Sequence, residues 1–320
     1  MAAALIRTLA IILAFIAGYF LPSLSGLSWM IRWLIVGMLF ITFLGVRFGK
    51  LKPERRHWFI VVVTLAMGLG PFFLLKWLGY EDIAIAAFFV GIPPTATAAP
   101  VIMGFLKGNV EFVLTSLIVV NASICALMPL IMPLVVGRGG IEIYGQVAGS
   151  VGFVMIVPFV LAMIVRRWKH RSVLWPRKLK DVSFGVWVAC LVLIAAHASD
   201  DIHNRPELSH SILLWIGILS LAICALNFGI GYLLGGPDRR RECSQSLGQK
   251  NTTLTIFLAM IYAPSPIASL GPTFYVLWHN LWNAWQLNRA GRDKMRVVLM
   301  DNERTGELES LSYKARKSGR

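Results

Sequence analysis

Apolar and polar positions alternate along this chain on the scale of whole helices. Predominantly apolar segments of about 20 residues are separated by short polar connections, and a helix of that length crosses the hydrocarbon core of a bilayer. The ten segments lie at residues 4–20, 28–46, 57–79, 82–106, 110–137, 143–166, 181–198, 210–235, 241–263 and 266–287. The pattern predicts an all-α integral membrane protein with ten transmembrane helices.

The composition excludes a soluble globular protein. Of the 320 residues, 57% are hydrophobic and 15% are charged, and the mean hydropathy is +0.67. The predicted spans use nearly the whole length, so no additional folded domain is expected. The 4 cysteines have no CxxC spacing and no grouping with histidine, so the sequence predicts neither a metal site nor a cofactor.

The formal net charge of +15 would suggest a nucleic-acid partner if the basic residues formed one patch. They are instead concentrated in alternate connections, at residues 47–56, 166–180 and 239–241, and from Arg289 onward. By the positive-inside rule this predicts a multi-pass protein of the plasma or inner membrane with both termini in the cytoplasm. The expected partners are the lipid bilayer and a small-molecule substrate, not nucleic acid. Residues 289–320 are expected to form a basic cytoplasmic tail.

The ten spans divide into two sets of five, residues 1–137 and 138–288. Because five is odd, the second set must cross the bilayer in the opposite sense, which is the geometry of inverted repeats in secondary transporters. Pro93 and Pro94 interrupt the fourth span of the first set, and a run of polar residues around Gly248 interrupts the fourth span of the second set. The prolines alone would also fit a simple kink. Paired interruptions at corresponding positions predict two broken helices.

These two segments resemble the bile acid:sodium symporter family, within the wider group of bile acid, arsenite and riboflavin transporters. The first match is the run GIPPTATAAPV from Gly91 to Val101, followed by LKGN at residues 106–109. The second match runs from Gly248 to Leu254. The resemblance implies a panel of four helices (spans one, two, six and seven) beside a core of six. It also implies that broken helices four and nine cross at the substrate site.

The sequence departs from that family at the sodium ligands. The family's Ser-Asn pair falls on Ala99 and Pro100, and the two hydroxyl ligands of its fifth helix fall on Val113 and Leu117. Its glutamate falls on Ser246, and its glutamine falls on Lys250. Of the 16 acidic residues, those that touch a predicted span, including Glu111 and Glu242, all lie at its end. We therefore expect that the usual sodium sites are missing. A sodium site built from neutral oxygens is the alternative.

Lys250 is the permanently basic residue that we expect near the middle of the bilayer. A lysine there costs about 2.5 to 3.5 kcal/mol on insertion scales. Three roles are open to it. Its ammonium group could stand in for the family's sodium ion, it could hold an anionic substrate, or, as a titrating amine, it could couple transport to the proton gradient. The structural alternative is a side chain that extends along its stem to the membrane interface.

The expected charges of the broken helices favour an anion in the site. Span four enters from outside and span nine from inside, so the N-termini of both second half-helices, near Thr97 and Thr252, meet in the middle of the membrane. Each N-terminus carries about half a positive charge and free N–H groups, and Lys250 adds a full charge. We expect a small organic anion. Its candidate binding residues, besides Lys250, are Thr95, Thr97, Asn121, Gln249, Asn251 and Thr252.

The sequence thus predicts a secondary transporter that moves the anion by alternating access and is either proton-coupled or facilitative. A sodium-coupled organic anion symporter with a rearranged ion site is the alternative within the same class. An intramembrane enzyme, a channel or a sensor is the alternative of another class. His279 could approach Ser246 or Cys243, but the sequence has no HExxH motif and no mid-membrane pair of aspartates.

Overall fold

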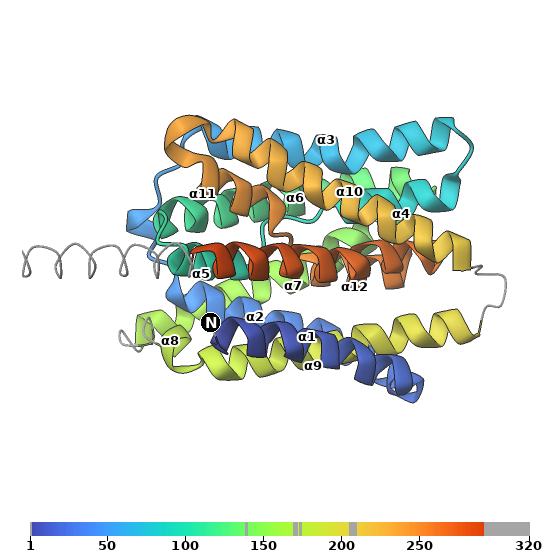
Figure 1. Cartoon of the computed structure of the whole chain (residues 1–320), viewed down its shortest axis with the longest axis horizontal. Coiled ribbons are helices and arrows are strands. Elements are labelled where there is room, and N and C mark those ends of the chain that lie inside the picture. The colour runs from blue at the N-terminus through green and yellow to red at the C-terminus, as the bar shows by residue number, and fades with distance from the viewer. Residues whose placement is uncertain (1, 138–139, 169–171, 173–174, 205–209, 291–320) are drawn as a thin grey trace, which may run out of the picture.

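The computed structural model describes residues 2–137, 140–168, 172, 175–204 and 210–290, and these residues contain helices but no β-strand (Figure 1). The helices are α1 (Ala2–Phe20), α2 (Met30–Gly45), α3 (Arg55–Trp77), α4 (Glu81–Gly91), α5 (Ala98–Phe105), α6 (Val110–Val136), α7 (Ile141–Trp168), α8 (Trp175–Lys178), α9 (Lys180–His203), α10 (His210–Leu234), α11 (Gly236–Gly248) and α12 (Thr252–Tyr262). A further helix covers residues 267–290. Two short 3-10 helices, η1 (Pro22–Leu27) and η2 (Phe48–Lys50), precede α2 and α3. The predicted tail lies outside the described residues from residue 291 onward.

The apolar helices are those of a multi-pass membrane protein. Five of them, in the described part of the chain, are long and apolar enough to cross a membrane: α3, α6, α7, and the apolar stretches of α9 and α10. Large apolar side chains face outward, such as Trp77 at 81% and Leu233 at 77% exposure, as expected on a surface that contacts lipid. The prediction of an all-helical membrane protein is confirmed in this form. Ten crossings arranged as two inverted repeats stay a prediction.

Local sequence signals determine several helix ends. Glu54 and His57 form a capping box at the start of α3. At the start of α6, the Phe112 N–H donates to the side chain of Asn109 at 2.9 Å. After α6, Gly137 adopts a left-handed conformation with φ of 68°, which a glycine tolerates and which ends the helix.

A short helical turn and a kink precede the ninth span. The sequence predicts a start at residue 241, but α11 begins at Gly236. Gly236 has a φ of 57°, so the chain turns sharply after α10. Pro237 then lies in the first turn of α11, where a proline costs no helical hydrogen bond. Arg239 has a non-helical backbone, with φ of −133°, so the helix is kinked there, and its regular part begins close to the predicted residue 241.

The helices pack in two groups. Helices α1, α2, α7 and α9 form the first group, through contacts of α1 with α9 and of α2 with α7 and α9. Helices α3 to α6 and α10 to α12 form the second group, together with the 267–290 helix, whose Trp278 donates to the Gly217 carbonyl of α10. In Figure 1, α1, α2 and α9 lie along the lower side of the molecule, and α3, α10 and α11 lie along the upper side.

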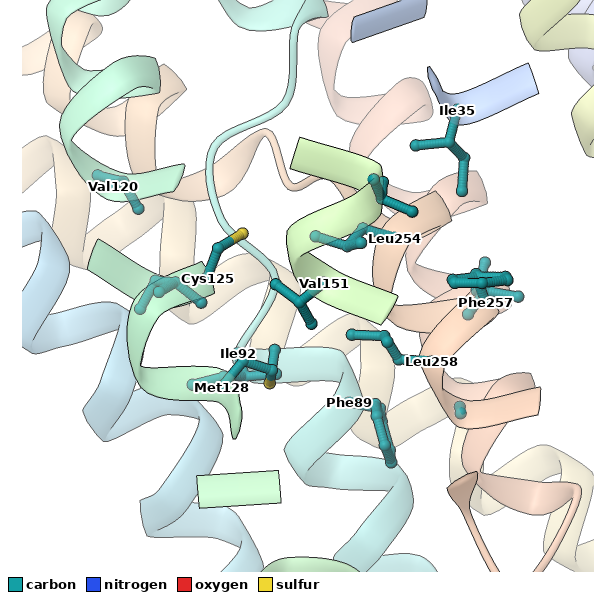
Figure 2. Close-up of a cluster of buried hydrophobic side chains, with 14 of the residues drawn as sticks. Ile35, Phe89, Ile92, Val120, Cys125, Met128, Val151, Leu254, Phe257 and Leu258 are labelled. Atoms are coloured by element: carbon teal, nitrogen blue, oxygen red, sulfur yellow. The ribbon is translucent and has the colours of Figure 1, made fainter. Parts of the chain in front are cut away.

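The two groups meet where α7 contacts α6 and where α12 contacts α2 and α7. The hydroxyl of Tyr262, the last residue of α12, donates to the Gln146 carbonyl of α7 at 2.8 Å and lies 2.7 Å from the Ser150 hydroxyl. A buried apolar cluster also joins the groups (Figure 2). It includes Ile35 of α2, Val151 of α7, and Leu254, Phe257 and Leu258 of α12.

Candidate functional site

The two interruptions, between α4 and α5 and between α11 and α12, are hydrogen-bonded to each other. The Ala96 N–H donates to the Gln249 carbonyl, and the Asn251 N–H donates to the Pro94 carbonyl, each at 2.7 Å. Thr95 and Lys250 thereby form an isolated antiparallel bridge. We call residues 92–97 and 249–251 the crossing. It is the centre of the candidate site.

Prolines explain why α4 stops at the crossing. Pro93 and Pro94 lack the backbone N–H that a continuing helix needs, and their rings clash with the preceding turn. The Ile92 N–H therefore makes the last helical hydrogen bond, to the Phe88 carbonyl, at 2.9 Å. The helix resumes at Ala98 as α5.

Glycines allow neighbouring helices to approach the crossing closely. A Cβ atom added to Gly91 would lie 1.9 Å from the Met67 carbonyl oxygen of α3. A Cβ atom added to Gly248 would lie 2.3 Å from the Phe228 ring of α10. Any larger residue at either position would displace these neighbours, so the sequence requires glycine where α4 and α11 end.

Side chains satisfy carbonyl groups that the interruptions leave without helical partners. The Thr95 hydroxyl donates to the Ser246 carbonyl at 2.6 Å, and the Asn121 amide donates to the Thr95 carbonyl at 2.8 Å. The Tyr275 hydroxyl, from the 267–290 helix, donates to the Gly248 carbonyl at 2.8 Å. Because a buried carbonyl without a donor costs about 1 to 3 kcal/mol, these bonds stabilise the interruptions.

Lys250 is enclosed at the crossing. Its side chain is 2% exposed, and its Nζ donates to Oγ1 of Thr64 in α3 at 3.3 Å. The ion pairs found among the described residues do not include Lys250. This burial excludes a side chain that reaches the membrane interface. The partner described for the amine is therefore a hydroxyl, without a compensating negative charge.

The predicted binding residues lie at or beside the crossing, but their surroundings differ. Thr97 and Asn251 are partly exposed, so both have surface that a ligand can contact. The buried members of the predicted set are Thr95, Asn121, Gln249, Lys250 and Thr252.

Gln249 is held on the opposite side of the crossing from Lys250. Asn283 of the 267–290 helix donates to Oε1 of Gln249, and Gln245 donates to Oδ1 of Asn283 at 3.1 Å. Successive residues of an extended segment point to opposite sides, which agrees with the different helices that these two side chains contact. The sequence places Gln249 and Lys250 together on one anion. In the structure, Oε1 of Gln249 takes part in a network of amides, and a shared anion stays a prediction.

Two residues of the site were not identified from the sequence. Thr64 contacts Lys250 across 186 positions of the chain. Tyr275 contacts the end of α11 and accepts a hydrogen bond from Asn227 of α10 at 3.2 Å. In the sequence, each of these residues is recognisable only as a polar group within an apolar helix. That pattern does not indicate which neighbour the polar group contacts.

The residues of the enzyme alternative are not assembled into a catalytic group in the described residues. The His279 ring packs against Tyr275 with 5.4 Å between ring centroids. Nδ1 of His279 and Oγ of Ser246 are buried and have no hydrogen-bond partner there. That part of the chain also contains no group of three or more His, Cys, Asp or Glu residues that could hold a metal ion.

Two helices begin at the crossing. Helix α5 begins at Ala98 and α12 at Thr252, directly after the two extended segments. A helix N-terminus carries partial positive charge and free N–H groups. The two N-termini and the Lys250 amine thus lie at the same place in the structure.

Comparison with known proteins gives two matches. A sequence model of the SBF-like CPA transporter family matches residues 8–282, which is most of the chain. A curated protein of Bacillus subtilis (strain 168), named "Uncharacterized sodium-dependent transporter YocS", is 26% identical over 290 aligned residues, covering 83% of this chain and 84% of that protein.

Proposed function

Because this chain belongs to the SBF-like CPA transporter family, we propose that it is a secondary transporter that carries a small organic anion by alternating access. The family and the named relative support a membrane transporter rather than an enzyme. Our proposal goes beyond the family in three respects: the substrate is an anion, it binds at the crossing, and its transport is coupled in a stated manner.

The burial of the Lys250 amine is the observation that carries the proposal. A lysine at this depth costs about 2.5 to 3.5 kcal/mol on insertion scales, so it needs a charged partner or a function. Its described partner, the Thr64 hydroxyl, supplies a hydrogen-bond acceptor and no negative charge. The anionic group of a substrate would complete the pair. The partly exposed Thr97 and Asn251 would donate hydrogen bonds to it.

We assign the two helix groups to the two parts that move in alternating access. The first group, with α1, α2, α7 and α9, would be the panel, and the second group, which contains the crossing, would be the core. Two inverted repeats, residues 1–137 and 138–288, would place both interrupted helices at equivalent positions. The basic connections orient both termini toward the cytoplasm of a plasma or inner membrane.

Transport in this proposal is proton-coupled or facilitative and does not use the family's usual sodium sites. Thr95 and Tyr275 already donate to carbonyl oxygens at the end of α11. Lys250 brings a cation of the protein itself to the crossing. A further cation beside this amine would meet electrostatic repulsion, whereas an anion would be attracted.

A sodium-coupled symporter with a rearranged ion site is the second candidate. The name of the Bacillus subtilis relative favours it, since that protein is called sodium-dependent. Three buried side-chain oxygens near the crossing also have no hydrogen-bond partner among the described residues: Asn121 Oδ1, Gln245 Oε1 and Ser246 Oγ. Neutral oxygens of this kind can contribute to a site for a hard cation.

A thermal-shift screen tests the anion and the ion together. Purified protein in detergent is heated with acetate, benzoate, succinate or methanesulfonate, in sodium buffer and in potassium buffer. A ligand that binds the native state raises the free energy of unfolding, by about 2.7 kcal/mol at 100 times its Kd. We expect at least one anion to raise the Tm of the wild type equally in both buffers and to leave Lys250→Gln unchanged.

Lys76→Gln is the matched control, because it removes an exposed lysine at the end of α3. It should keep the shift. A shift that requires sodium and persists in Lys250→Gln would contradict the proposal and favour the second candidate. No shift with any of the four anions would count against a substrate of these classes.

A further inference from the structure

Thr64 is a buried residue in direct contact with the Lys250 amine. It lies in α3, its side chain is 0% exposed, and its Oγ1 accepts the hydrogen bond from Lys250 Nζ at 3.3 Å. Among the hydrogen bonds found in the described part of the chain, this is the contact that the amine makes. The position of the ammonium group therefore depends on the position of α3.

Close backbone contacts hold α3 against the crossing. One turn after Thr64, a Cβ atom added to Gly68 would lie 2.9 Å from Cβ of Ile92. The Met67 carbonyl oxygen lies against Gly91, as described above. Residues at i, i+3 and i+4 share one face of a helix, so Thr64 lies on the face of α3 that packs on the crossing.

The chemistry of the contact explains why a hydroxyl suits this position. An ammonium group has three N–H donors and no acceptor, so a buried lysine needs acceptors nearby. A carboxylate would satisfy the amine but would also neutralise its charge and lower the affinity of the site for an anion. A threonine hydroxyl accepts a hydrogen bond and leaves the positive charge uncompensated.

We propose that Thr64 is a positioning residue, which holds the Lys250 ammonium group at the crossing and leaves its charge available to an anionic substrate. The contact between Thr64 and Lys250 stands independently of the transport proposal. The role of the free charge rests on the proposed function.

A double-mutant cycle tests the contact without any substrate. The Tm values of wild type, Thr64→Val, Lys250→Met and the double variant are compared in detergent. Thr64→Val should lower the Tm because it leaves a buried amine without its acceptor. The double variant should recover most of that loss, because an apolar pair replaces both partners. Thr42→Val is the matched control, since the Thr42 hydroxyl donates within its own helix, to the Met38 carbonyl at 2.9 Å.

Additive effects of Thr64→Val and Lys250→Met on the Tm would overturn the contact. It would also be overturned if Lys250→Met were coupled to Thr42→Val as strongly as to Thr64→Val. If Thr64→Val alone fails to fold, the double variant still decides the question. A folded double variant supports the contact. An unfolded double variant beside a folded Lys250→Met overturns it.

Anion binding tests the role of the free charge. The probe is the anion of the four-member screen that stabilises the wild type most. We expect Thr64→Ser to keep its affinity within about threefold and Thr64→Val to lose about tenfold, because only serine retains the acceptor. Thr64→Asp should abolish binding, since its carboxylate pairs with the ammonium group. Wild-type affinity in folded Thr64→Asp would overturn this role.

The two proposals fail in different ways. Binding that survives in Lys250→Gln, together with a coupled cycle, would contradict the proposed function and leave the contact intact. Additive behaviour in the cycle, together with binding that is lost in Lys250→Gln, would contradict the role of Thr64 and leave the proposed function intact. A screen in which no anion binds the wild type contradicts the role of the charge, and the cycle still decides the contact.

Discussion

Asn121 illustrates how one polar residue of an apolar helix supports the crossing. Its amide donates to the Thr95 carbonyl of the crossing and to the Leu117 carbonyl of its own helix, each at 2.8 Å. The bond to Leu117 is local, whereas the bond to Thr95 ties α6 to the interrupted segment. Asn121 therefore has a structural role, whether or not it also contacts substrate.

Asn121→Leu should lower the free energy of unfolding by about 1 to 3 kcal/mol, because it leaves the buried Thr95 carbonyl without this donor. Asn280→Leu is the matched control, since the Asn280 amide donates to the Val276 carbonyl of its own helix at 2.7 Å. Its cost should be about 0.5 kcal/mol or less. Thermal unfolding of both variants in detergent measures the difference. Equal costs would show that the bond to Thr95 contributes no stability.

At the level of single residues, the sequence allowed the burial of Lys250 to be predicted, but not its surroundings. Insertion costs and the polar flanking residues indicate a lysine that stays inside the protein. The contact with Thr64 depends on the packing of α3 on the crossing, across 186 positions, and no local pattern encodes that packing. The same limit applies to Gln249, whose orientation toward Asn283 follows from the position of the 267–290 helix.

The interrupted helices were the most predictable elements, because their causes are local. Pro93 and Pro94 end α4 by removing backbone donors. The polar run marks the second interruption, although its residues up to Gly248 belong to α11 and those from Thr252 onward to α12, so that only residues 249–251 are not helical. The start of α11 was harder to predict, since the turn at Gly236 depends on a left-handed backbone conformation rather than on hydropathy. The antiparallel bridge between Thr95 and Lys250 is a tertiary contact, for which the sequence offers only the paired positions of the two interruptions.

The close packing of α3 on α4 can be tested with one methyl group. Gly91→Ala would place Cβ 1.9 Å from the Met67 carbonyl oxygen, so the two helices must separate. Overpacking of this kind costs about 1 to 3 kcal/mol. Gly70→Ala is the control within α3, because a Cβ atom there meets nothing within 4 Å. Thermal unfolding should show a lower Tm for Gly91→Ala alone, and an unchanged Tm for Gly91→Ala would contradict the close approach.

At the scale of the whole molecule, the two helix groups contact each other at Tyr262. The Tyr262 hydroxyl joins α12 to Gln146 and Ser150 of α7, and apolar residues around Leu254 fill the space between the groups. If the two groups move relative to each other in alternating access, the contact of Tyr262 with α7 would have to break in one of the two states. The sequence predicted the helices themselves, since each needs only an apolar stretch of sufficient length. It did not predict which helix faces contact each other between the groups.

Uptake by proteoliposomes is the most direct test of the central claim, that the buried amine of Lys250 serves an organic anion without the usual sodium sites. The substrate is the anion that stabilises the protein most, and uptake is compared in sodium and in potassium, at several pH values, for wild type and Lys250→Gln. We predict wild-type uptake of equal rate in both salts, and uptake by Lys250→Gln that is abolished or has a different pH dependence. Strictly sodium-driven uptake that is the same in Lys250→Gln would contradict the claim.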